Sequence, residues 1–82
     1  MKKKKDPLLV KFGNLVRKAR EEKNISQEEL GYELNLHRTY IGMIERAERN
    51  ISFLHALKII QHFNLNIIDL YESDKQTAYR KR

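Results

Sequence analysis

Several side chains suited to base recognition fall on one face of a short segment in the middle of the chain. Ile41 and Ile44 have the spacing of the buried face of a helix. A step of about 100° per residue then turns Thr39 and Arg46 outward. Arg38 is long enough to give two hydrogen bonds to guanine O6 and N7, and a threonine can donate or accept at a base edge. The pattern predicts contacts to base edges in a major groove, with these candidates: Arg38, Thr39, Tyr40 and Met43.

Each candidate also has a purely structural interpretation. An exposed arginine is usually solvated or paired with a nearby acid. Base contact is therefore the favoured role of Arg38 only if its helix docks on DNA. The ring of Tyr40 can equally pack against the body of the domain. Met43 is apolar on an otherwise polar face, which suits thymine methyl groups, but lone exposed methionines are common. The sequence leaves these alternatives open.

The elements that must position these residues are helices, because the apolar periodicity predicts an all-α fold. Pro7 suits a first helical position, and Ser26-Gln27-Glu28-Glu29 is a capping-box sequence at the start of a second helix. Asn64 can end a helix in the left-handed conformation. We expect a compact bundle of five short helices over about 7–23, from 27 to near 35, from 37 or 38 onward, over 53–63 and over 67–72.

The five helices are expected to form one DNA-binding domain over residues 7–73. A basic tail at 1–6 precedes it, and a polar and basic tail at 74–82 follows. In the fourth helix we predict an apolar stripe that faces the core. Its main residues are Phe53, Ala56, Leu57, Ile60 and Phe63, and Leu54 and Ile59 flank it.

The second and third helices can meet at a steep angle across a short turn. Gly31 lies where they cross and offers the small side chain that a close approach requires. Asn35 is the best non-glycine residue for the positive φ of the turn. Ile41 and Ile44 then pack back onto the preceding helix. Together these positions predict a helix-turn-helix over residues 27–46.

These residues resemble a known family. The helix-turn-helix of phage-repressor-like (Cro/repressor) regulators is similar to this chain over about residues 8–72, on the strength of Ser26-Gln27-Glu28-Glu29-Leu30-Gly31, Asn35-Leu36, Ile41, Ile44 and Glu45. Within this family, the chain more narrowly resembles the controller proteins of restriction–modification systems. The residues that carry this resemblance are His37-Arg38-Thr39-Tyr40-Ile41, Ile44-Glu45-Arg46 and Arg49-Asn50-Ile51-Ser52. Gly31 replaces the usual alanine and Asn35 the usual glycine, but both replacements preserve the physical requirement.

Phosphate contacts are expected to flank the base contacts. Gln27 begins a helix, where free backbone amides attract a phosphate, and the resemblance implies a backbone contact there. The resemblance also places Arg49 on DNA, while Ser52 has the alternative role of a simple helix cap. The candidates for backbone contact are Gln27, Arg46, Arg49, Asn50 and Ser52.

Glu45 falls on the inward side of its helix, where an unpaired carboxylate is costly. Arg20 follows Val16 by four residues and edges the inner face of the first helix. The resemblance implies an ion pair between Arg20 and Glu45. We interpret the pair as structural, because it would fix the orientation of the recognition helix.

The resemblance further implies a homodimer, since such regulators bind twofold-symmetric operators with half-sites ~34 Å apart. The last helix is more apolar than one buried face requires. Leu65 and Leu70 are expected to close the core, which leaves a self-complementary surface of Ile67, Ile68 and Tyr71, with Ile59 or Phe63 beside it. The alternative is that all of these residues are core.

Composition narrows the function classes but does not choose among them. The net charge is +6, yet Lys2–Lys5 and Arg80–Arg82 at the two ends supply seven of the seventeen cations, so the body is nearly neutral. Such tails are usually solvated ends and sometimes phosphate-seeking arms. The chain has no cysteine and three scattered histidines, so neither a disulfide nor a metal site is expected. We expect a soluble, cytoplasmic protein without a membrane span.

The leading hypothesis is a sequence-specific transcriptional regulator of double-stranded DNA, in its narrower form a restriction–modification controller. The main alternative is the antitoxin of a toxin–antitoxin pair on the same fold. A third is a protein- or membrane-interaction module that uses the basic tails. An enzyme is not expected, because no nucleophile–histidine or phosphate-loop motif is present, and we expect no cofactor or small-molecule ligand.

Overall fold

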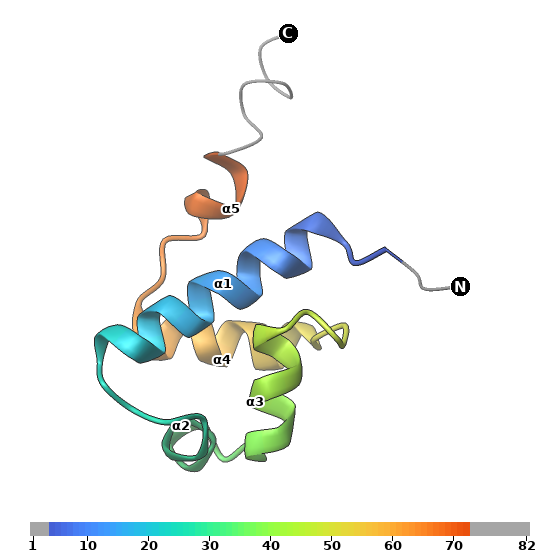
Figure 1. Cartoon of the computed structure of the whole chain (residues 1–82). Helices are drawn as coiled ribbons and strands as arrows, with labels where there is room; N and C mark the ends of the chain where they lie inside the picture. Colours follow the sequence, from blue (N-terminus) through green and yellow to red (C-terminus); the bar gives the residue numbers. More distant parts are fainter. Residues whose placement is uncertain (1–3, 73–82) are drawn as a thin grey trace, which may run out of the picture.

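The computed structural model describes residues 4–72 and contains five helices (Figure 1). They are α1 (Pro7–Glu22), α2 (Gln27–Leu34), α3 (Arg38–Glu45), α4 (Phe53–Phe63) and α5 (Ile68–Glu72). The predicted all-α fold is confirmed, and the helix ends differ from expectation by only a residue or so. Within the described range no helix has the length and apolar character needed to cross a bilayer. The tail predicted at 74–82 lies outside the described residues.

Side-chain caps fix where the helices begin. Ser26 Oγ accepts from the amide of Glu29 at 2.9 Å, and Glu29 Oε1 accepts from the amide of Ser26 at 2.7 Å, so the predicted capping box is confirmed. His37 Nδ1 accepts from the Thr39 amide at 3.0 Å and caps α3. Ser52 caps α4 by accepting from the His55 amide at 3.2 Å. Each cap satisfies an amide that the helix itself cannot bond.

Residues with positive φ end the helices and form the turns. Asn24, Asn35 and Asn64 have φ of 58°, 61° and 54°, and asparagine tolerates this conformation better than other non-glycine residues. Ala47 also has positive φ, at 57°, directly after α3. Its side chain is buried, so packing holds a conformation that the alanine itself disfavours by roughly 1–2 kcal/mol.

The core lies between the first four helices and contains Phe12, Val16, Leu30, Leu34, Ile41, Ile44 and Ile59. Two parts of the stripe predicted for α4 are wrong. Ile59, expected at its flank, is fully buried, and Phe53, expected in its main part, is 74% exposed. The buried face follows the spacing i, i+3, i+4, i+7 from Ala56 through Ile59 and Ile60 to Phe63. Phe53 is the first residue of α4, three residues before that series begins.

Gly13 permits α1 to lie directly against the end of α3. A Cβ atom built on Gly13 would lie 2.5 Å from the carbonyl oxygen of Ile44 and 2.7 Å from that of Glu45. Real Cβ atoms do not approach backbone oxygens so closely, so only glycine fits this crossing. The close approach at Gly13 was not predicted from the sequence, because a glycine inside a helix has no local signature of the partner that it contacts.

We expect Gly13→Ala to destabilise the fold by about 2 kcal/mol, because the added methyl group forces α1 away from α3 and outweighs the better helix propensity of alanine. Chemical denaturation followed by circular dichroism measures the change. The matched control is Asn14→Ala, one residue along on the exposed side of α1, which should leave stability the same or slightly higher. Equal stability of both variants would contradict the close crossing.

Candidate nucleic-acid interface

The turn between α2 and α3 sets the steep angle seen in Figure 1. The Leu36 amide donates to the carbonyl of Gly31 at 2.8 Å, and Asn35 takes the left-handed conformation between them. A Cβ on Gly31 would collide with the carbonyl oxygen of Leu36 and would lie 3.3 Å from the amide nitrogen of Arg38. The predicted helix-turn-helix is therefore present, and Gly31 accommodates the turn and the first residue of α3.

α3 divides into an inward and an outward face. Ile41 and Ile44 are buried, at 0% and 3% exposed, as predicted. Arg38 and Thr39, at the start of the helix, are exposed. Met43 is half-buried, so it presents less apolar surface to solvent than the sequence suggested. The exposed side chains are therefore concentrated in the first turn, which is the part of a recognition helix that enters the major groove.

Three helices meet at the carboxylate of Glu45. Arg20 on α1 donates through Nε at 2.7 Å and through Nη2 at 3.0 Å, so the predicted ion pair is present and bidentate. Gln27 at the start of α2 donates its side-chain amide to the same carboxylate at 3.0 Å. The hydrogen bonding of the Arg20 guanidinium to the Glu45 carboxylate raises the pKa of Arg20 above its ordinary value, although burial opposes this. The network holds the end of α3 against both other helices.

The bond from Gln27 to Glu45 was not predicted, and it qualifies the role expected for Gln27. Its side-chain nitrogen is committed to the carboxylate. The backbone amide of Gln27 remains at the start of α2, where anions bind favourably. The network therefore joins a candidate phosphate-binding helix terminus directly to the recognition helix. A glutamine at a helix start beside an inward carboxylate is the only sequence signal that could have indicated it.

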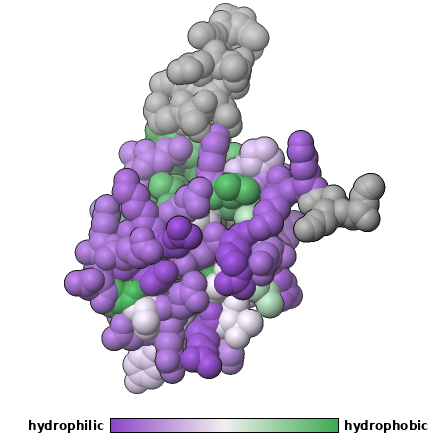
Figure 2. Space-filling view, viewed as in Figure 1, coloured by the Kyte–Doolittle hydropathy of each residue, from purple (hydrophilic) through white to green (hydrophobic). Residues whose placement is uncertain are grey.

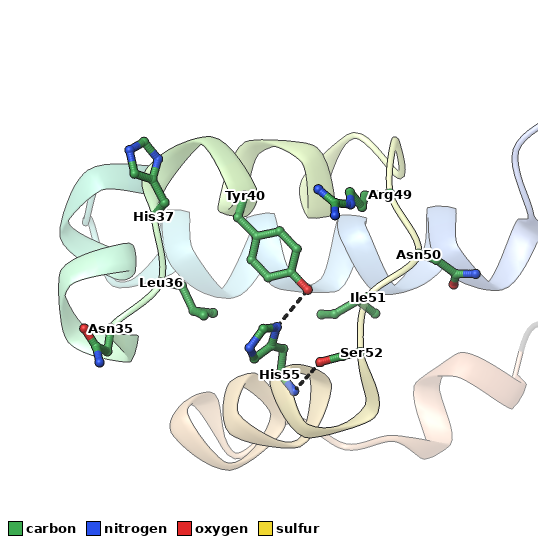
Figure 3. Close-up of a pocket in the computed structure, with 9 residues that line it drawn as sticks. All are labelled: Asn35, Leu36, His37, Tyr40, Arg49, Asn50, Ile51, Ser52 and His55. Atoms are coloured by element: carbon green, nitrogen blue, oxygen red, sulfur yellow. Dashed lines mark hydrogen bonds between the residues drawn. The ribbon is translucent and has the colours of Figure 1, made fainter.

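Tyr40 crosses a shallow pocket between α3 and α4 (Figure 3). Its hydroxyl lies 2.8 Å from Nδ1 of His55, and the two rings meet edge to face with centroids 5.1 Å apart. The guanidinium of Arg49 lies over the Tyr40 ring, 5.8 Å from its centroid. Packing against the body, one of the two roles considered for Tyr40, is thus observed. Arg49 and Asn50 are exposed at the rim of the same pocket.

Two candidate arginines face carboxylates. Arg38 Nη1 lies 3.7 Å from Glu28 Oε1, with both side chains mostly exposed. Arg46 donates from Nε and Nη2 to the two carboxylate oxygens of Glu48, at 2.9 and 3.1 Å. Their hydrogen bond raises the pKa of Arg46 and lowers that of Glu48. Such exposed pairs contribute little to folding, so both arginines can exchange their partners.

The described end of the N-terminal tail contacts the segment after α3. Lys5 Nζ donates to the carbonyl of Arg46 at 2.7 Å. Lys4 and Lys5 line a shallow depression that Arg49 and Asn50 also line. This part of the tail is therefore placed beside candidate phosphate contacts instead of projecting freely into solvent.

Apolar side chains are exposed around α5 (Figure 2), and Phe53 and Leu54 at the start of α4 are exposed as well, at 74% and 70%. Ile67 and Ile68 are each 47% exposed, and Leu8 is 48% exposed. The side chain of Tyr71 lies outside the part of the chain that the structure describes. Ile59, named as a possible neighbour of this surface, is fully buried in the core, so that expectation is wrong. Phe63 is half-buried.

Comparison with known proteins identifies the family to which this chain belongs. The model of the helix-turn-helix family matches residues 16–70. Control protein C.BamHI of Bacillus amyloliquefaciens is 45% identical over 62 residues, which are 74% of this chain and 76% of that protein. This chain belongs to the helix-turn-helix family, and within it to the control proteins. Control protein C.MunI of a Mycoplasma species is similar too, at 35% identity over 76% of this chain and 85% of its own length.

Solved structures agree with this membership. The restriction–modification controller protein C.AhdI from Aeromonas hydrophila superposes on this helix-turn-helix protein with a TM-score of 0.66 and 39% identity, over 76% of this chain and 94% of its own. The controller C.Esp1396I, solved as a tetramer with its natural 35 base-pair operator, superposes with a TM-score of 0.66 and 36% identity, over 80% of this chain and 87% of its own. These relatives support the regulator hypothesis over the antitoxin.

We expect Glu45→Ala to destabilise this helix-turn-helix protein by about 3 kcal/mol, because it leaves Arg20 and Gln27 without their shared buried partner. Denaturant unfolding measures the loss. Gln27→Ala removes only one donor and should cost about 1 kcal/mol. A Glu45→Ala protein with normal stability and altered sequence preference would show that Glu45 acts at DNA and not in the fold.

Proposed function

We propose that this chain is a sequence-specific transcriptional regulator that binds double-stranded DNA as a homodimer and acts as a restriction–modification controller. The observation that carries the proposal is the rigid placement of α3. Its last residue, Glu45, is held by two other helices, while its first turn presents Arg38 and Thr39 to solvent. A short helix in a fixed position whose first turn is polar and exposed is suited to insertion in a major groove.

Base recognition in this proposal belongs to Arg38 and Thr39. Arg38 leaves Glu28 and gives two hydrogen bonds to a guanine, and Thr39 contacts a neighbouring base edge. Met43 and Tyr40 are secondary base contacts. Met43 offers an apolar contact to thymine methyl groups, and the Tyr40 hydroxyl must share or release its bond to His55 to reach a base.

Phosphate contacts flank the recognition helix on both sides. The helix start at Gln27 lies on one side, and Arg46, Arg49 and Asn50 lie at and beyond the end of α3. Ser52 is engaged as a cap, and its hydroxyl proton remains available to a phosphate oxygen. These groups fix the register of α3 without reading sequence.

Dimerisation supplies the second half of the recognition. One helix contacts too few base pairs to select a site within a genome. The exposed apolar surface of Ile67 and Ile68 is the candidate interface, and a twofold arrangement would pair it with its own copy. Tyr71 is proposed to extend the same surface.

Selection from a random duplex library should yield a pseudo-palindromic sequence. Arg38→Ala and Thr39→Ala should each relax the preference at one or two positions per half-site, with a loss of roughly 1–3 kcal/mol for Arg38. Binding is measured by titration at fixed salt. The control is Arg17→Ala, an exposed arginine of α1 paired with Glu21. A wild-type protein without any sequence preference would refute the proposed function, and unchanged preference in both variants would refute these base contacts.

Ile68→Glu should weaken the dimer more than about tenfold, because the change places a charge at an apolar interface twice, once in each protomer. Sedimentation across a concentration series measures the association. Tyr32→Glu serves as the control. Tyr32 is 88% exposed on α2, so this substitution adds the same charge away from α5. A wild-type monomer at high concentration, both free and on DNA, would rule out the dimer.

A further inference from the structure

Glu48 forms an ion pair with Arg46, one of the arginines proposed above to contact the DNA backbone. The Arg46 guanidinium gives it two parallel hydrogen bonds, from Nε at 2.9 Å and from Nη2 at 3.1 Å. Guanidinium binds phosphate oxygens in the same forked geometry. The two oxygens of Glu48 therefore take the positions that two oxygens of a phosphate group would take.

The paired guanidinium lies on the surface that the proposed function turns toward DNA. Arg46 folds back along α3, so that a Cβ on Gly42 would lie 3.0 Å from Arg46 Nη1 and 3.4 Å from Gln27 Oε1. Since Gly42 has no side chain, the guanidinium and the start of α2 come together at one place. Glu48 thus puts a negative charge beside two candidate phosphate contacts.

The pair is suited to exchange. The side chains of Arg46 and Glu48 are 53% and 44% exposed, so water can replace either partner and little folding energy is lost. Lys5 reinforces the positive field, because its ammonium donates to the Arg46 carbonyl at 2.7 Å. Arg46 and Lys5 therefore both act electrostatically on the single carboxylate of Glu48, and a phosphate that displaced Glu48 would enter the field of both cations.

We propose that Glu48 is an internal competitor of DNA, a positioning residue whose carboxylate holds Arg46 until a phosphate group replaces it. This inference rests on the proposed function, because it requires α3 to dock on a duplex. The exchange involves no base, so Glu48 lowers affinity for every duplex. It thereby sets the protein concentration at which an operator becomes occupied.

The test is Glu48→Gln, which removes the charge and keeps the size of the side chain. We expect about fivefold tighter binding at roughly 0.1 M salt, both to the duplex recovered by selection and to an arbitrary duplex of equal length. The control is Glu21→Gln, which makes the same change of net charge and breaks an exposed pair with Arg17 on α1. It should change affinity less than about twofold. Equal effects of the two variants would overturn the proposal.

A double-mutant cycle with Arg46→Gln shows whether Glu48 acts through Arg46. Arg46→Gln should weaken binding, and adding Glu48→Gln to it should change nothing further. An effect of Glu48→Gln that persists without Arg46 would mean general charge repulsion and would overturn the proposal. So would unchanged or weaker binding by the single variant, whatever its melting temperature. The arbitrary duplex keeps this test separate from the proposed sequence-specific binding, which fails if the wild-type protein lacks sequence preference.

Discussion

The buried carboxylate of Glu45 is the interaction on which the arrangement of the domain depends. Its side chain is 2% exposed, and a carboxylate so buried is stable only with donors around it. Arg20 supplies two donors and Gln27 a third, so α1, α2 and α3 are joined at one group. Arg20 also donates to the carbonyl of Ile25 at 2.9 Å, which ties the loop before α2 to the same centre. An apolar contact could fill this space, but it would not fix the directions of three helices.

Close backbone approach complements this polar centre. α3 has only eight residues, and isolated helices of that length are not stable in water. α3 is stable in the fold because Gly13 allows α1 to pack against the carbonyl groups at the end of α3. Gly31 likewise leaves room for the turn at the start of α3. Ile41 and Ile44 fill the space between these two approaches. The recognition helix is therefore held at both ends, and its exposed face is free to carry side chains chosen for a ligand.

Sequence patterns predicted what depends on local rules. The helices, the Ser26 capping box and the left-handed Asn35 follow from periodicity, cap chemistry and turn conformation. The Arg20–Glu45 pair came from family resemblance, since nothing local links residues so far apart. The remaining errors and omissions all concern packing between elements. Phe53 has the right residue type for a core but is exposed at the first position of α4, and no local rule could reveal the crossing at Gly13.

The same distinction explains why the charge of the chain was uninformative about DNA. The body is nearly neutral, and acids stand beside the very arginines proposed to contact a duplex, as Glu28 does for Arg38 and Glu48 for Arg46. A total charge cannot reveal such pairing, but a structure can. Association with DNA then replaces one anion by another at fixed guanidinium groups, so affinity depends on how firmly each acid holds its arginine. Small changes at these acids can therefore adjust binding without altering the buried network that supports α3.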